Sequence, residues 1–161
     1  MTKVLIIDAP YYAHISKELR AGAEAVLKQA GVEWDYKTVP GVLEIPAALS
    51  MVIQEGLDPF EEPQFAALDR GQETPPLYDA FVVLGCVIRG ETTHYEIVAY
   101  ESARALMRMA VDLALPIGNG ILTVENEAQA LARAKASEMD KGGHAARAAI
   151  EMLKFRDNLG E

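Results

Sequence analysis

The sequence is poor in several residue types, and each shortage narrows the class of protein. A single cysteine, Cys86, occurs in 161 residues, so no disulfide forms within the chain. That cysteine and the three histidines, His14, His94 and His144, show no metal-ligand spacing, and we expect neither a metal nor a cofactor. No apolar run approaches the length of a membrane span, and residues 1–4 lack the pattern of a signal peptide. We therefore expect a cytoplasmic protein without membrane contact.

Positive charge is also scarce. Lysine and arginine together number 15 against 24 acidic residues, which gives a net charge of −9 at pH 7. Phosphate backbones and anionic lipid surfaces repel such a chain, so we expect no nucleic-acid partner. Apolar residues, in contrast, are plentiful. They form 50% of a chain whose length suits one domain, residues 1–161, with a full core.

Strand and helix patterns alternate along the chain. Short apolar or β-branched runs predict strands at 4–7, 34–39, 80–88 and 117–123. Amphipathic patterns predict helices at 14–30, 44–55, 94–113, 127–134 and 141–155. Because parallel strands need right-handed crossovers, this order predicts an α/β fold, a three-layer α/β/α sandwich with a four-stranded parallel flavodoxin-like sheet. Such a sheet binds ligands at the carboxyl ends of its strands.

One segment departs from this alternation. Residues 57–78 contain four of the eight prolines, Pro59, Pro63, Pro75 and Pro76. We interpret the segment as a proline-rich surface insertion between a helix and a strand. A lid over a functional site is the alternative, which the composition supports less well.

The junction after the strand at 80–88 is the most informative part of the sequence. The strand is almost wholly apolar, as a strand covered on both faces is, and it runs through a short turn into a helix. Gly90 allows a sharp turn, and Thr93 with Glu96 has the spacing of a capping box, which starts a helix. Free N–H groups at a helix start bind anions, phosphate most often. His94 then lies beside a bound phosphate, where it suits proton transfer on a phosphorylated substrate.

The same junction has a plain structural interpretation. Strand–turn–helix corners occur in every α/β protein, and a lone histidine such as His94 is more often a polar surface residue there. Cys86, in the buried strand, is by pattern a small core residue rather than a reactive thiol. In favour of a site, Tyr11, residues 41–44 and the residues after Thr123 reach the same edge of the predicted sheet. A helix start favours a neutral imidazole and a bound phosphate favours the imidazolium, so both forms stay open.

Three segments together resemble the 6,7-dimethyl-8-ribityllumazine synthase family of riboflavin biosynthesis. They are Val39–Pro46, Gly85–Tyr95, and Gly120–Thr123 followed by Gln129, Ala130 and Arg133. The resemblance covers nearly the whole chain except residues 57–78. It implies a transferase that condenses 5-amino-6-(D-ribitylamino)uracil with 3,4-dihydroxy-2-butanone 4-phosphate. The products are 6,7-dimethyl-8-ribityllumazine, phosphate and water, in the penultimate step of riboflavin biosynthesis.

The resemblance also implies roles for particular residues. His94 takes the place of the proton-transfer histidine, and Tyr11 that of an aromatic ring stacked on the pyrimidine. Arg133 matches an arginine that reaches the phosphate from a neighbouring subunit, which implies active sites between adjacent subunits. The remaining matches bind phosphate, namely Glu91 and Thr92, or lie against the pyrimidine and ribityl groups, namely Val42, Leu43, Glu44, Cys86, Val87, Ile88, Asn119 and Lys141.

Several of these residues have a second interpretation from the pattern alone. Tyr12 competes with Tyr11 for the stacking role. Glu44 suits the first turn of a helix, since the helix dipole favours a carboxylate there. Arg133 and Lys141 are by pattern solvated surface cations.

Two departures from the family pattern shape the remaining expectations. Asn119 stands where many members have a phenylalanine that closes the pyrimidine pocket from the adjacent subunit. Residues 135–140 lack the Gly-Thr-Lys-x-Gly-Asn type of turn of members that build sixty-subunit shells, and the sequence starts almost at its first strand. We therefore expect a homopentamer. Because an amide stacks less well than a phenyl ring, a paralogue that binds riboflavin-like ligands or acts as a scaffold is the second hypothesis. An unrelated flavodoxin-like binding module is the third.

Overall fold

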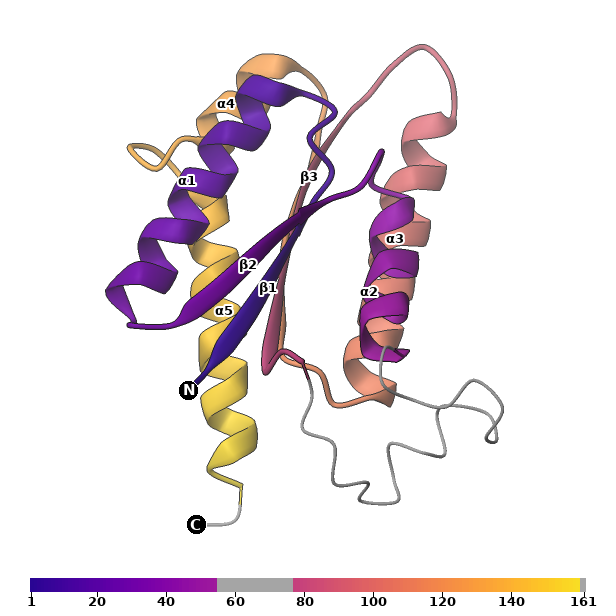
Figure 1. Cartoon of the computed structure of the whole chain (residues 1–161). Helices are drawn as coiled ribbons and strands as arrows, with labels where there is room; N and C mark the ends of the chain where they lie inside the picture. The colour runs from indigo at the N-terminus through magenta and orange to yellow at the C-terminus, as the bar shows by residue number, and fades with distance from the viewer. Residues whose placement is uncertain (55–76, 160–161) are drawn as a thin grey trace.

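The structure is a computed structural model that describes residues 1–54 and 77–159 (Figure 1). Four strands form one sheet in the order β2-β1-β3-β4, and every pairing in it is parallel. The strands are β1 (Lys3–Asp8), β2 (Glu33–Thr38), β3 (Ala80–Ile88) and β4 (Ile117–Val124). The predicted four-stranded parallel sheet is therefore confirmed, and the bounds of β3 are those predicted from its unbroken apolar run.

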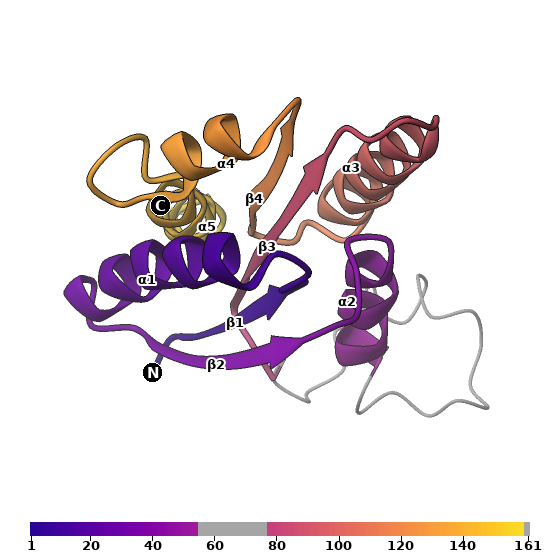
Figure 2. The ribbon, with the colours of Figure 1, turned by 90° about the horizontal axis from the view of Figure 1, so that it is seen from above.

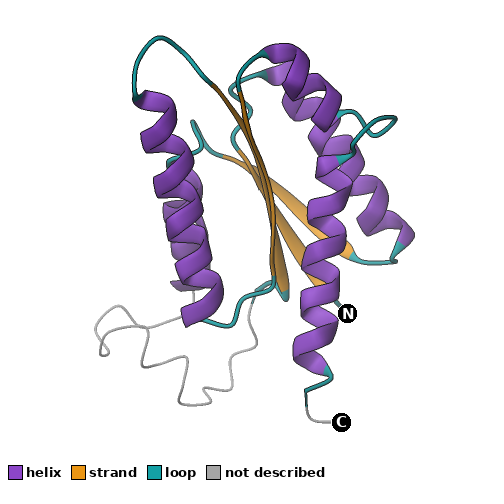
Figure 3. Ribbon diagram, turned by 180° about the vertical axis from the view of Figure 1, so that it is seen from behind, coloured by secondary structure: helices purple, strands orange, loops and turns teal. Residues whose placement is uncertain are grey.

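Helices cover both faces of the sheet (Figures 1 and 2). One face carries α1 (Ala13–Gln29), α4 (Glu127–Ala134) and α5 (Lys141–Asp157), and the other carries α2 (Glu44–Gln54) and α3 (His94–Asp112). Figure 3 shows the sheet between these two helical layers. The three-layer α/β/α sandwich is thus confirmed. The predicted end of α2 at residue 55 and nearly all of the insertion predicted at 57–78 lie outside the described residues.

The central strand β3 serves two hydrophobic cores at once. Its even-numbered residues pack in the core under α1 and α5, and its odd-numbered apolar residues pack in the core under α2 and α3. This double burial explains why the strand is apolar at every position rather than at alternate ones. The edge strand β4, in contrast, alternates between buried and more exposed residues, because its second face is only partly covered.

A buried carboxyl group closes the carboxyl end of β1. Asp8 is fully buried, and its Oδ2 accepts hydrogen bonds from the hydroxyls of Ser16 on α1 and Tyr36 on β2, the latter at 2.8 Å. Its Oδ1 has no partner among the described residues. Burial raises the pKa of Asp8, and the hydrogen bonds from Ser16 and Tyr36 oppose that rise without cancelling it. Asp8 therefore ties the first turn of α1 to β2 near the carboxyl end of the sheet.

We expect Asp8→Asn to change how stability depends on pH. Folding raises the pKa of Asp8 above 3.8, so the folded state retains a proton that the unfolded state has lost over the pH range between the two pKa values. The contribution of Asp8 to stability is therefore fully present below the unfolded pKa and is lost as the pH rises through the folded one. D8N should gain stability relative to the wild type as the pH rises from about 4 to 7, measured by urea unfolding.

Asp35→Asn is a matched control of opposite sign. Asp35 on β2 pairs with Lys3 at 2.8 Å and accepts a hydrogen bond from Tyr78 at 2.7 Å. The Lys3 hydrogen bond, followed by that of Tyr78, lowers the pKa of Asp35. Its contribution is present above the unfolded pKa and is lost as the pH falls, so D35N should lose most stability near neutrality. A D8N profile parallel to that of the wild type would contradict our account of Asp8.

Candidate active site

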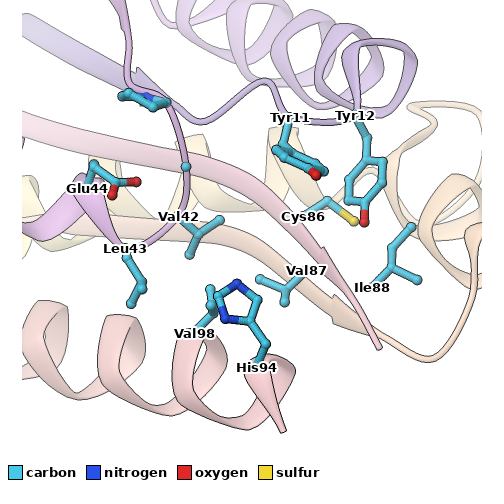
Figure 4. A pocket seen from close by; sticks show the side chains of 12 residues that line it. Tyr11, Tyr12, Val42, Leu43, Glu44, Cys86, Val87, Ile88, His94 and Val98 are labelled. Atoms are coloured by element: carbon cyan, nitrogen blue, oxygen red, sulfur yellow. The ribbon is translucent and has the colours of Figure 1, made fainter. Parts of the chain in front are cut away.

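A pocket of about 340 Å³ opens at the carboxyl end of the sheet (Figure 4). Strands β1 and β3 are neighbours there, and β1 leads into a helix on one face while β3 leads into a helix on the other. Ligands of open α/β sheets bind at such switch points. The pocket is lined by Tyr11, Tyr12, Pro40, Gly41, Val42, Leu43, Glu44, Cys86, Val87, Ile88, His94 and Val98. Eight of the residues to which the family resemblance gave a role are among them.

The floor of the pocket is apolar. Val42 and Val87 are buried on either side of it, and Val98 of α3 lies beneath them (Figure 4). Gly85 makes this closeness possible, since a Cβ at that position would lie 2.8 Å from Cγ2 of Val42. Burial raises the pKa of the Cys86 thiol to about 11, so the thiol is protonated at neutral pH and acts as a further apolar surface. Such a floor suits a flat, uncharged ring.

Two tyrosines form the wall that follows β1. Their rings pack edge to face, with centroids 5.0 Å apart and an interplanar angle of 76°. Tyr11 is 74% exposed, whereas Tyr12 is half-buried and lies close to Cys86 and Ile88 (Figure 4). Burial raises the pKa of Tyr12, and its hydroxyl has no hydrogen-bond partner in the described part of the chain. The wall thus offers a ligand both an aromatic face and a free hydroxyl. Both Tyr11 and Tyr12 therefore remain candidates for the stacking role.

The opposite wall is the tight turn between β2 and α2. The Glu44 N–H donates to the Gly41 carbonyl at 3.2 Å, which closes the turn just as the helix begins. The Glu44 carboxylate folds back over Gly41, where a Cβ would lie 2.8 Å from Oε2. Glycine at this position therefore lets the carboxylate lie along the wall of the pocket. No described residue pairs with that carboxylate, which leaves it able to accept hydrogen bonds from a ligand.

His94 is the first residue of α3, and its ring projects toward Val42 and Val87 (Figure 4). The side chain is exposed, and no described residue forms a hydrogen bond or ion pair with the imidazole. Both ring nitrogens are therefore available to a molecule in the pocket. The sequence predicted this position, a histidine at a helix start and at the carboxyl end of β3.

The capping box predicted for this helix start is wrong. Thr93 makes no side-chain cap, and the Glu96 carboxylate bonds to Nη1 of Arg89 instead. A charge-assisted bond to a guanidinium is stronger than a bond to a neutral N–H, and it wins the competition for Glu96. Gly90 also lies outside the left-handed region, so the turn does not use the conformational freedom predicted for it. The turn nevertheless has N–H groups that are available to an anion, because those of residues 91–93 have no partner in the described chain.

The remaining predicted residues do not line this pocket. Glu91 and Thr92 are exposed on the turn next to His94, and their N–H groups have no partner in the described chain. Asn119 is exposed in the middle of the edge strand β4, and its Oδ1 accepts a hydrogen bond from the Ile121 N–H at 2.9 Å. Arg133 on α4 and Lys141 at the start of α5 belong to the helical layer on the other face of the sheet (Figure 2). One chain alone therefore leaves these three side chains away from His94.

Arg133 has an unused positive charge. Its Nη1 donates to the backbone carbonyl of Gln129 at 3.1 Å, and no carboxylate pairs with it in the described part of the chain. No carboxylate of the described residues pairs with Lys141 either.

Residues 1–54 and 77–159 contain no group of three or more potential metal ligands. None of their helices is long and apolar enough to cross a membrane.

Four pocket residues were given no binding role by the sequence-based prediction: Tyr12, named only as a competitor of Tyr11, Gly41, expected only to lie at this edge of the sheet, and Pro40 and Val98. Val98 lies four residues after His94, so helical periodicity alone places it on the same side of α3. Pro40 and Gly41 lie in the segment 39–46 that carried the family resemblance, and their contribution is the backbone of the turn.

Together these features define an α/β protein of flavodoxin-like fold, with an apolar pocket beside a helix start whose N–H groups have no partner in the described chain. The comparison with known families is more specific. The family model for 6,7-dimethyl-8-ribityllumazine synthase matches residues 1–157. The chain belongs to this family, and it is a transferase of riboflavin biosynthesis.

Individual relatives support this assignment. A 6,7-dimethyl-8-ribityllumazine synthase of Beijerinckia indica is 51% identical over 159 residues, which is 99% of this chain and 78% of that protein. One of Agrobacterium fabrum is 49% identical over 157 residues, covering 98% of this chain and 96% of the relative. One of Nitrobacter hamburgensis is 48% identical over 159 residues, which cover 99% of this chain and 88% of the relative. The resemblance inferred from three short segments is therefore confirmed over nearly the full chain.

Proposed function

We propose that the pocket at His94 is the site where 5-amino-6-(D-ribitylamino)uracil condenses with 3,4-dihydroxy-2-butanone 4-phosphate. One observation carries the proposal. An unpaired imidazole faces an apolar pocket, and unpartnered N–H groups at the same helix start lie beside it. A proton carrier and a phosphate site are thus adjacent, as a reaction that expels phosphate needs.

The pocket walls suit the pyrimidine substrate. Tyr11 offers its exposed face for stacking on the ring, and the backbone and side chains of residues 86–88 border the ring from the sheet side. Val42 and Leu43 contribute apolar contact next to them. The free carboxylate of Glu44 accepts hydrogen bonds from ribityl hydroxyls, for which a carboxylate is the strongest neutral-pH acceptor.

The phosphate substrate binds at the turn before α3. The free N–H groups at residues 91–93, which include those of Glu91 and Thr92, point to where a phosphate accepts hydrogen bonds at the positive end of the helix. Arg133 of a neighbouring subunit adds a guanidinium whose two parallel donors match phosphate oxygens. Lys141 contributes a further positive charge near that boundary.

His94 moves protons through the reaction. The 5-amino group of the uracil attacks the ketone, and loss of water gives a Schiff base. Phosphate then leaves, the side chain isomerises, and the ribitylamino nitrogen closes the second ring with loss of another water. Each step transfers a proton at a carbon, nitrogen or oxygen near the imidazole, and a histidine both accepts and donates protons near neutral pH.

The active unit in this proposal is a homopentamer with sites between adjacent subunits. Helix α3 carries a stripe of apolar side chains, each more than half exposed, at Ile97, Tyr100, Met107 and Val111. Apolar stripes of this length mark contact surfaces. In this proposal Asn119, on the more exposed face of β4, lies at a subunit boundary and closes a neighbour's pocket. The chain as one domain, its cytoplasmic location and the lack of a nucleic-acid partner belong to the same proposal.

A direct assay tests the reaction. Purified protein with both substrates should develop the absorbance of a lumazine and release one phosphate for each lumazine formed. Native mass spectrometry should show five copies of the chain. Absence of turnover together with tight flavin binding would contradict the proposal and favour a riboflavin-binding paralogue.

A further inference from the structure

Arg89 links two turns at the carboxyl edge of the sheet. It follows β3 directly, and its backbone N–H donates to the Val124 carbonyl at the end of β4 at 2.9 Å. Its Nε donates to the Glu125 carboxylate at 2.9 Å, and its Nη1 donates to Glu96 on the first turn of α3. The guanidinium also lies 4.2 Å above the centroid of the Tyr95 ring. One side chain thus contacts the start of α3 twice and the β4–α4 turn once.

The contacts continue from Glu125 into α4. The Glu125 N–H donates to the side-chain oxygen of Gln129 at 2.9 Å, and the Gln129 N–H donates to Oδ1 of Asn126, also at 2.9 Å. The Gln129 carbonyl accepts the Arg133 bond already described. The start of α3 and the arginine of α4 are therefore joined by an unbroken series of hydrogen bonds that passes through Arg89.

We propose that Arg89 is a positioning residue, which fixes the turn at residues 90–93 so that its N–H groups hold the phosphate-bearing substrate next to His94. The inference rests on the proposed function and deepens it. Arg89 acts through its anchors Glu96 and Glu125 and does not contact the phosphate.

Direct phosphate binding is the rival role for Arg89. Two carboxylates already occupy its Nε and Nη1 donors, and they largely cancel its charge for an anion nearby. The effect on Glu96 is consistent with this, since the Arg89 hydrogen bond lowers the pKa of that carboxyl group. The contact of the guanidinium with the Tyr95 ring, 4.2 Å from the ring centroid, further restrains the side chain. Geometry therefore favours an anchored group over a ligand-binding one.

Lysine cannot reproduce these contacts, because a single ammonium lacks the planar fork that reaches two carboxylates and covers a ring. We expect R89K and R89A to raise the KM for the butanone phosphate and the inhibition constant of inorganic phosphate by about tenfold. The KM for the uracil substrate should change less than about twofold, since its walls lie elsewhere. An equal rise in the KM values of both substrates, or an unchanged inhibition constant of inorganic phosphate, would overturn the proposal.

R156A is the matched control for loss of an arginine. Its side chain has the same 38% exposure as Arg89 and pairs with Asp157 near the end of α5, at the opposite end of the molecule (Figure 1). R156A should leave both KM values unchanged. Thermal unfolding of all variants separates positioning from stability: a R89K variant with a normal melting temperature and weakened phosphate affinity supports the proposal.

E125Q separates positioning from direct contact. If Arg89 positions the turn through Glu125, E125Q weakens phosphate binding although it removes a negative charge. If Arg89 binds phosphate itself, E125Q frees the guanidinium and tightens binding, which would overturn the proposal. E127Q controls for the charge change, because Glu127 follows the same turn as the first residue of α4, has a comparable exposure of 61% against 56%, and pairs with His14 instead.

Calorimetric titration with inorganic phosphate keeps the inference separate from the proposed function. If the wild-type protein shows no turnover, the proposed function is contradicted. The titration would still compare the phosphate affinity of R89K with that of the wild type. Wild-type turnover with equal phosphate affinity in R89K would remove the inference alone.

Discussion

Replacing His94 by alanine should lower kcat by about 100- to 10,000-fold, the range typical of a lost general acid–base group. The reason is positional: no other titratable side chain except the Glu44 carboxylate, the Cys86 thiol and the two tyrosine hydroxyls lines the described pocket. The thiol and the Tyr12 hydroxyl have pKa values raised by burial, so both are protonated near neutrality. An imidazole, in contrast, is the kind of group that both gives and accepts protons near pH 7. Lumazine formation followed by absorbance measures the effect.

H144A is the control for this prediction. His144 is exposed on α5, in the helical layer on the other face of the sheet, and its loss should leave kcat unchanged. The affinity of H94A for inorganic phosphate should also stay close to that of the wild type, since the backbone N–H groups of the turn remain. Undiminished turnover in H94A would show that another group carries the protons.

Gly142→Ala should destabilise the fold by about 3 kcal/mol, which corresponds to a loss of roughly 6–12 °C in melting temperature for a chain of this size. A Cβ at residue 142 would lie 1.9 Å from the backbone oxygen of Leu19 and 2.7 Å from its carbonyl carbon. Both atoms belong to the backbone of α1, so no side chain can move aside to make room. Helices α1 and α5 would have to move apart, which would disturb the packing of the helical layer that also contains α4. Thermal unfolding measures this effect.

Gly90→Ala is the matched control for that substitution. Nothing lies within 4 Å of a Cβ built at Gly90, and its backbone lies outside the left-handed region. Alanine there should change stability by less than about 0.5 kcal/mol. A melting temperature of G142A equal to that of G90A would contradict the close contact between α1 and α5.

The sequence predicted the strands and helices well where burial is uniform. β3 is buried on both faces, so its apolar run has sharp ends, and His94 follows as the first residue of α3. Glu127–Ala134 was predicted to the residue, and in the structure Asn126 caps this helix by accepting a hydrogen bond from the Gln129 N–H. Such local signals are readable in the sequence itself.

The misses have tertiary causes. Glu96 has the spacing of a capping box, yet Arg89, seven residues before it, takes the carboxylate, and Glu125 from another turn shares the same guanidinium. No local pattern announces this competition. Asn119 and Arg133 could not be placed from one chain either, because the proposed site needs a second subunit to bring them to His94.

The shared site is the central claim, and mixing two impaired variants tests it most directly. H94A and R133A subunits, unfolded together in equal amounts and refolded, should assemble into mixed rings. If each site takes His94 from one subunit and Arg133 from the next, random mixing restores about a quarter of the sites, since each requirement is met half the time. Activity should then rise to about a quarter of that of refolded wild type, well above either variant alone. Activity no higher than the average of the two variants, in rings that mass spectrometry shows to be mixed, would contradict a site built between subunits.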